Sequence, residues 1–150
     1  MGDNSFTQLL EKKKHEIEKN SASSKRRLSR WRMALIELEM KLSKWLEAPI
    51  KKHVVTLAKS PKAIVEELLG QYTVNTCTVT ISGRRVVFDP IGTYVVGAYG
   101  RVDVLGPATG FKLIREKDDG HWSLVDPSDP RVATPLTKDV FEKILLAAIG

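Results

Sequence analysis

Apolar residues in the second quarter of the chain recur at alternating spacings of three and four. Six positions form this stripe, which we call the seam: Leu28, Trp31, Leu35, Leu38, Leu42 and Trp45. The spacing predicts a helix from about Ser24 to Leu46 whose apolar stripe packs against a partner helix. The helix should end near Pro49, because the residue before a proline is pushed out of the helical conformation. Packing of the seam on the chain's own sheet remains the alternative.

The same helix carries apolar residues on a different side, namely Met33, Ile36 and Met40. A helix with two apolar sides usually lies between two neighbours, here a partner and the body of the protein. Upstream, four apolar residues share one face of an earlier predicted helix that runs to about Lys19: Phe6, Leu9, Leu10 and Ile17. The stretch 20–24 is poor in helix formers, so we expect a break or bend there.

Residues 50–59 have the pattern of a connector. Ser60 followed by Pro61 is typical of a helix start, and Gly70 of a helix end. Ile64, Val65, Leu68 and Leu69 would supply the apolar face between them. These signals predict a short helix over residues 61–69.

From residue 72 onward the apolar period changes to two, which is typical of strands. Cys77, Val79 and Ile81 share one face of the first strand, and Ser82-Gly83 indicates a tight turn after it. Short connections favour antiparallel neighbours, so we predict a β-meander of about five strands. A proline-rich passage, 126–135, then leads to a last helix, which Thr137 caps and whose buried stripe includes Phe141.

The predicted fold class is therefore α+β. An N-terminal helical arm with a short coiled-coil seam precedes an antiparallel β-meander of about five strands packed with a C-terminal helix. We divide the chain into a basic helical arm with its connector, residues 1–59, and a small α+β domain, residues 60–150. All of the net charge of +6 comes from the first part, which has 14 basic and 7 acidic residues, against 10 and 11 in the second. Such asymmetry is typical both of polyanion-binding arms and of solvated helices.

Five basic residues near the start of the seam could each neutralise a phosphate: Lys25, Arg26, Arg27, Arg30 and Arg32. They form a possible polyanion-binding site. The sequence offers no comparable pattern for catalysis, because His15, His53 and His121 lack a second ligand at metal-binding spacing. We assign no catalytic, metal-binding or cofactor-binding residues and expect no cofactor, so the sequence leans away from an enzyme.

Two further details bear on chemistry. Arg101 and Asp103 flank Val102 on one face of a strand, which predicts a salt bridge on the open side of the sheet. The only cysteine, Cys77, lies in an apolar alternating run, which predicts a buried thiol. Together with the lack of a membrane-length apolar run or a signal peptide, this predicts a cytoplasmic protein without a membrane partner.

These patterns favour a non-catalytic protein-interaction or assembly (adaptor) protein that associates through its N-terminal helix, with itself or with another chain. The six seam residues would form the partner-helix interface. One alternative is an accessory nucleic-acid-binding protein that uses the basic arm. Another is a small ligand-binding or enzymatic domain whose pocket lies between sheet and helix.

Overall fold

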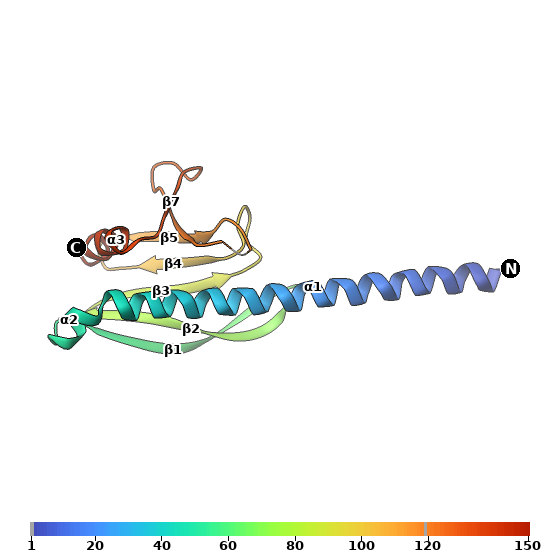
Figure 1. Ribbon diagram of the computed structural model, residues 1–150, viewed down its shortest axis with the longest axis horizontal. Coiled ribbons are helices and arrows are strands. Elements are labelled where there is room, and N and C mark those ends of the chain that lie inside the picture. Colours follow the sequence, from blue (N-terminus) through green and yellow to red (C-terminus); the bar gives the residue numbers. More distant parts are fainter. Residues whose placement is uncertain (1, 119) are drawn as a thin grey trace.

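The computed structural model describes residues 2–118 and 120–150, with the backbone alone for residues 2–4. Three helices and seven strands follow one another in this part of the chain (Figure 1). Their bounds are α1 (Gly2–Trp45), α2 (Glu47–Lys51), β1 (Thr56–Glu66), β2 (Gly70–Ile81), β3 (Arg84–Gly92), β4 (Arg101–Leu105), β5 (Gly110–Arg115), β6 (Trp122–Val125), β7 (Ala133–Pro135) and α3 (Lys138–Ile149). The α+β architecture is confirmed, with more strands than the five expected.

The strands form one antiparallel sheet in the order β1 to β7, so each strand pairs with its neighbour in the sequence. The helix predicted over residues 61–69 is wrong, because most of this segment belongs to β1. Ile64 and Val65 are β-branched, which suits a pleated strand, and Ile64 lies opposite Tyr72 of β2. Pro61 is tolerated because β1 is an edge strand. The boundary that we placed between residues 59 and 60 falls inside this strand.

Helix α1 is continuous through residues 20–24, so the predicted break is wrong. Serine and asparagine each lower helix stability by less than about 0.7 kcal/mol relative to alanine, and Ala22 is itself the best helix former. The strong helical segments on both sides outweigh that loss. The consequence is a single helix of 44 residues, and Figure 1 shows that its N-terminal half extends past the sheet.

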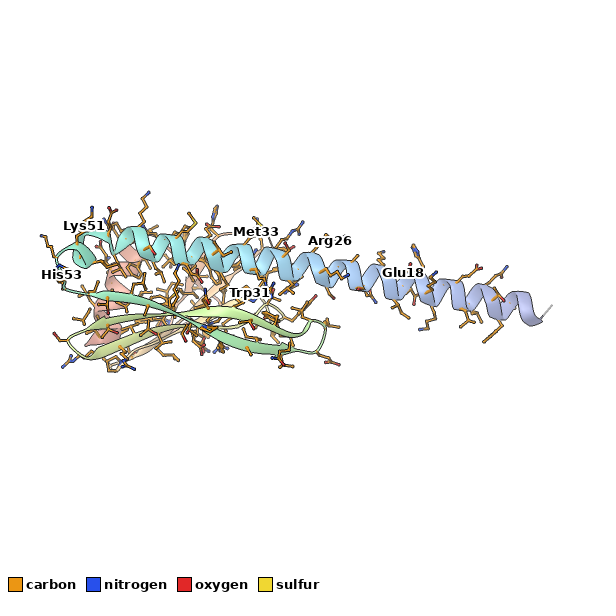
Figure 2. All side chains as sticks on the ribbon, turned by 90° about the horizontal axis from the view of Figure 1, so that it is seen from below. Glu18, Arg26, Trp31, Met33, Lys51 and His53 are labelled. Carbon is orange, nitrogen blue, oxygen red and sulfur yellow. The ribbon has the colours of Figure 1, made fainter. Side chains whose placement is uncertain are left out.

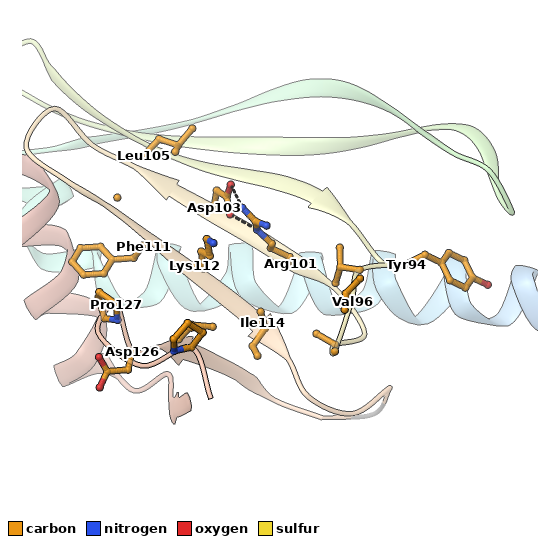
Figure 3. A pocket seen from close by; sticks show the side chains of 16 residues that line it. Tyr94, Val96, Arg101, Asp103, Leu105, Phe111, Lys112, Ile114, Asp126 and Pro127 are labelled. Atoms are coloured by element: carbon orange, nitrogen blue, oxygen red, sulfur yellow. Dashed lines mark hydrogen bonds and ion pairs between the residues drawn. The ribbon is translucent and has the colours of Figure 1, made fainter. Parts of the chain in front are cut away.

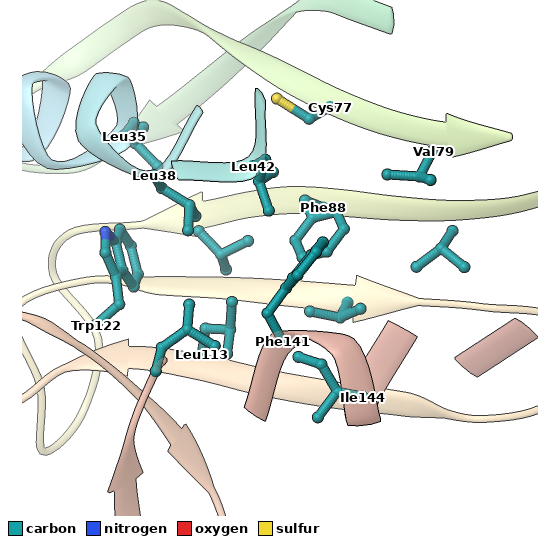
Figure 4. Packing of buried hydrophobic residues seen from close by; sticks show 14 of the residues in the cluster. Leu35, Leu38, Leu42, Cys77, Val79, Phe88, Leu113, Trp122, Phe141 and Ile144 are labelled. Atoms are coloured by element: carbon teal, nitrogen blue, oxygen red, sulfur yellow. The ribbon is translucent and has the colours of Figure 1, made fainter. Parts of the chain in front are cut away.

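One face of the sheet is covered by the second half of α1 together with α3. A close-packed hydrophobic core lies between these two helices and the sheet (Figure 4). The rings of Trp31 and Trp122 are 5.9 Å apart, and those of Trp45 and Phe141 are 5.3 Å apart. As predicted, the Thr137 side chain caps α3 by accepting the backbone N–H of Val140.

The ribbon formed by β1 and β2 twists along its length (Figure 2). Near β3, the odd-numbered Cys77 and Val79 are buried, whereas at the far end the even-numbered Tyr72 and Val74 are buried. The register stays constant between these pairs. Alternate residues of a strand point to opposite faces. The half of β2 that holds Tyr72 and Val74 must therefore turn the opposite face toward α1 from the half that holds Cys77 and Val79. This turn brings Tyr72 against Trp31 of α1.

Candidate interaction surface on helix α1

The seam packs on the chain's own sheet. Trp31, Leu35, Leu38 and Leu42 are buried in the core, and Leu28 and Trp45 are half-buried against it. The expectation that these six side chains face a partner helix is therefore corrected. The alternative that the sequence left open is the arrangement observed, because the heptad spacing fits a flat sheet as well as a helix.

The first part of α1 lies beyond the sheet, and we call residues 5–26 the arm. Every residue from Ser5 to Ser23 is exposed, and side chains radiate from this part of the helix into solvent (Figure 2). The exposed residues include four large apolar side chains, each with 53% to 65% of its surface exposed: Phe6, Leu9, Leu10 and Ile17. A helix this exposed gains no stability from packing within the chain, and its apolar residues lack any cover among the described residues.

A second exposed surface lies on the outer side of α1, and we call it the Met patch. Met33, Ile36 and Met40 are 67%, 54% and 67% exposed. They line a shallow groove of about 500 Å³ between α1 and the turn that joins β5 to β6. Figure 2 shows Met33 pointing away from the sheet and Trp31 pointing toward it. The helix therefore has two apolar sides, as the sequence predicts, and the outer one is uncovered.

The five basic residues proposed for a polyanion are not gathered into one site. Arg27 donates to the Thr93 hydroxyl over 3.1 Å and to the Thr93 carbonyl over 2.6 Å. Its guanidinium also lies 4.3 Å from the ring centre of Tyr94 and 4.4 Å from that of Tyr99. Arg30 pairs with Asp118. Lys25, Arg26 and Arg32 are exposed. Arg30 is exposed as well but is paired with Asp118, and Arg27 is held by the loop at Thr93.

A polar network fixes α1 where it leaves the sheet. The Glu66 carboxylate accepts the backbone N–H of Thr93 over 3.1 Å and that of Tyr94 over 2.9 Å, and it also accepts the Tyr72 hydroxyl. The indole of Trp31 donates to the same hydroxyl over 3.1 Å. Burial, followed by the hydrogen bond to Glu66, raises the pKa of Tyr72. The network and the Arg27 clamp give the arm a rigid base.

The sequence alone did not reveal this base. Thr93, Tyr94 and Tyr99 stand in a loop without a recognisable motif. Glu66 and Arg27, which bind this loop, lie 27 and 66 positions from Thr93 along the chain. Gly100 is the one residue whose type is a signal for this base. A side chain at Gly100 would meet the Trp31 ring at 2.3 Å, and Gly100 has a φ of +150°. The close approach of α1 therefore requires glycine at this position.

A buried cation lies beside the Met patch. Arg115 is almost fully buried, and its guanidinium donates to the backbone carbonyls of Asp118 and Tyr99. Its Nε has no hydrogen-bond partner within the described part of the chain. Burial lowers the pKa of Arg115, because desolvation disfavours the charged form. The groove is lined by Arg30 and Arg115 and by Glu37 and Asp118, so charges of both signs border the Met patch.

Another groove, of about 850 Å³, lies on the opposite face of the sheet from α1 (Figure 3). Here Arg101 donates to both carboxylate oxygens of Asp103 over 2.7 and 2.9 Å, which confirms the predicted salt bridge. The ligand-binding alternative placed a pocket between sheet and helix, where the packed core leaves a gap of only about 10 Å³ beside Leu35 and Cys77. The Cys77 thiol is buried as predicted, and burial raises its pKa to about 11.

Within residues 2–118 and 120–150, no group of three or more His, Cys, Asp or Glu side chains could hold a metal ion. No helix in the same part of the chain is long and apolar enough to cross a membrane. The chain matches no protein-family model, no curated protein and no solved structure.

Proposed function

We propose that the protein is a non-catalytic interaction or assembly protein that associates through helix α1. The observation that carries this proposal is the exposed apolar surface of the helix. Seven large apolar side chains of α1 are exposed, four on the arm and three on the Met patch. Contiguous exposed apolar residues with polar surroundings are typical of protein-binding surfaces, and methionine side chains adapt readily to different partners. The same proposal places the protein in the cytoplasm, supported by the free thiol of Cys77.

The edges of the sheet are less suited to binding than the helix. Edge strand β1 carries Lys59, Pro61 and Lys62, and the other edge, β7, is three residues long and ends at Pro135. Lysine, proline and short length are the features by which natural sheets avoid pairing with other strands. We therefore expect a partner to bind α1 rather than an edge strand.

Site-specific photocrosslinking in the native cell tests the proposal. A photoreactive phenylalanine analogue replaces Met33 or Leu10 in the full chain, and it replaces Leu146 in the control. Leu146 is a matched control because it is an exposed apolar residue on a different helix, α3. We expect the α1 positions to give discrete crosslinked species that Leu146 does not give.

The double variant Ile36→Glu with Met40→Glu should abolish the Met33 crosslink without changing the melting temperature, because both residues are exposed. Equal crosslinking from Leu146 and from both α1 positions would contradict the proposal. A crosslinked species that nuclease removes would instead support the nucleic-acid-binding alternative.

A further inference from the structure

We propose that a second copy of this chain covers the arm, with the two arms packed antiparallel about Ile17. This inference rests on the proposed function, since it names the partner of one of the two α1 surfaces. It concerns residues 6–28 alone and leaves the Met patch to another protein.

The arm continues the seam past the edge of the sheet. Counting back from Leu28 in steps of four and three, the seam positions are Ser24, Ser21, Ile17, Lys13, Leu10 and Phe6. They lie on the same face of α1 as the residues that pack on the sheet, because steps of three and four keep one face of a helix. The face of α1 that packs on the sheet in the second half of the helix is thus exposed in the first half.

The spacing of these positions is symmetric. From Ile17 the steps are four, three and four in both directions. An antiparallel pair with Ile17 opposite Ile17 therefore aligns every seam position. Leu10 lies opposite Ser24 of the second copy, and Phe6 lies opposite its Leu28, which is only half-buried within its own chain. A two-fold axis through Ile17 makes the contact self-complementary, as a closed dimer requires.

The position of Lys13 selects the antiparallel arrangement. In a parallel pair, Lys13 would face Lys13 in the seam, and like charges would repel. In the antiparallel pair it faces Ser21, whose small side chain lets the lysine stem extend to solvent. Antiparallel packing also separates the two Lys12–Lys14 clusters along the axis.

Charges beside the seam form both attractive and repulsive pairs in this register. Lys14 and Glu18 lie one turn apart on one flank and approach within 3.9 Å in the single chain. In the antiparallel pair, Lys14 comes within about 3 Å along the axis of Glu18 of the second copy, so two ion pairs form between chains. By the same count, Glu18 on this flank and Glu16 on the other flank each come equally close to their own symmetry mates, which gives two unfavourable pairs.

Sedimentation equilibrium of the full chain tests the dimer. We expect a monomer–dimer equilibrium whose dissociation constant rises at least about tenfold in Ile17→Glu, because both apolar side chains of the Ile17 pair are lost at the axis. Glu16→Gln should lower the dissociation constant, since it removes one of the two repulsive pairs. Val65→Glu is the control, because Val65 is exposed on β1. A protein that stays monomeric at high micromolar concentration, or equal constants for Ile17→Glu and Val65→Glu, would overturn the inference.

Disulfide trapping tests the register. A chain with Leu10→Cys is mixed with a chain with Ser24→Cys under mild oxidation. We expect the mixed disulfide to form faster than the Leu10→Cys homodimer, and the reverse order would indicate parallel arms and overturn the inference. The chain without either substitution is the control, because its native Cys77 is buried and should not form the disulfide. Failure of both tests with retained α1-specific photocrosslinking would reject self-association and leave the proposed function standing.

Discussion

Glu66 connects three segments at the base of the arm: the end of β1, Tyr72 of β2, and the loop that begins at Thr93. Its carboxylate accepts two backbone N–H groups of that loop. The loop also holds Arg27, so the carboxylate fixes the direction of α1 only indirectly. Gly92 beside it is constrained by this contact, because a Cβ there would lie 2.7 Å from Glu66 Oε1.

Glu66→Ala should therefore lower the free energy of unfolding by about 2 to 4 kcal/mol, since it leaves backbone donors unpaired near the core. Urea denaturation measures the change. Glu67→Ala is the control, because Glu67 is exposed in the turn after β1 and should change stability by less than about 0.5 kcal/mol. Equal effects of the two substitutions would show that the Glu66 hydrogen bonds are unimportant.

The buried thiol of Cys77 makes stability depend on alkaline pH. An unfolded thiol loses its proton near the ordinary pKa of 9.0, whereas the folded thiol keeps its proton up to about 11. Raising the pH from about 9 to 11 therefore favours the unfolded chain, and the stabilisation present below pH 9 is lost across this window. Denaturation of wild type and Cys77→Ala at pH 8 and at pH 10.5 should show the wild type losing more stability. Equal losses of unfolding free energy in the two proteins between pH 8 and pH 10.5 would contradict the prediction.

At the scale of elements, α1 is one helix with two different environments. Its second half depends on packing against the sheet, and its first half has no such support. Leu42→Ala should lower the free energy of unfolding by about 2 to 5 kcal/mol, because Leu42 is fully buried. Leu10→Ala on the same helix should change it by less than about 0.5 kcal/mol for the monomer. Thermal denaturation at low protein concentration, where a dimer dissociates, compares the two.

The contrast between β1 and the other strands shows what the sequence could predict. The alternating pattern around Cys77 and the turn at Ser82-Gly83 predicted the β2–β3 hairpin correctly. Residues of β1 looked helical because Ser60-Pro61 imitates a helix start. Pairing with β2 over eleven positions outweighed that local signal. Long-range pairing of this kind leaves no mark in a local window of residues, and the same holds for the Arg27 clamp.

The seam shows a second limit of sequence reasoning. Heptad spacing identifies the buried face of a helix without identifying what covers it. Leu28 and Trp31 were assigned to the correct face and to the wrong neighbour. The exposed outer side, marked by Met33, was anticipated from the second apolar stripe. The side of the helix was therefore predictable from periodicity, and its contact was not.

At the scale of the whole molecule, the sheet with α3 forms a body and the arm extends from it by about 33 Å, taking 1.5 Å for each residue from 5 to 26 (Figure 1). The base of that arm is fixed by the Arg27 clamp and by the ion pair of Arg30 with Asp118. An arm with a fixed base has fewer directions to lose on binding than a flexible tail. This geometry favours a defined complex over loose tethering.

The net positive charge of the molecule leads to a last prediction. Because Arg27 and Arg30 are engaged within the chain, we expect binding to mixed DNA or RNA to follow net charge alone. The double reversal Lys25→Glu with Arg26→Glu should then weaken binding no more than Lys138→Glu with Lys143→Glu, two exposed lysines of α3. Each reversal should change the unfolding free energy by less than about 1 kcal/mol. Fluorescence anisotropy across a salt series measures the affinity, and submicromolar binding at physiological salt that only the arm reversal abolishes would instead identify a polyanion site.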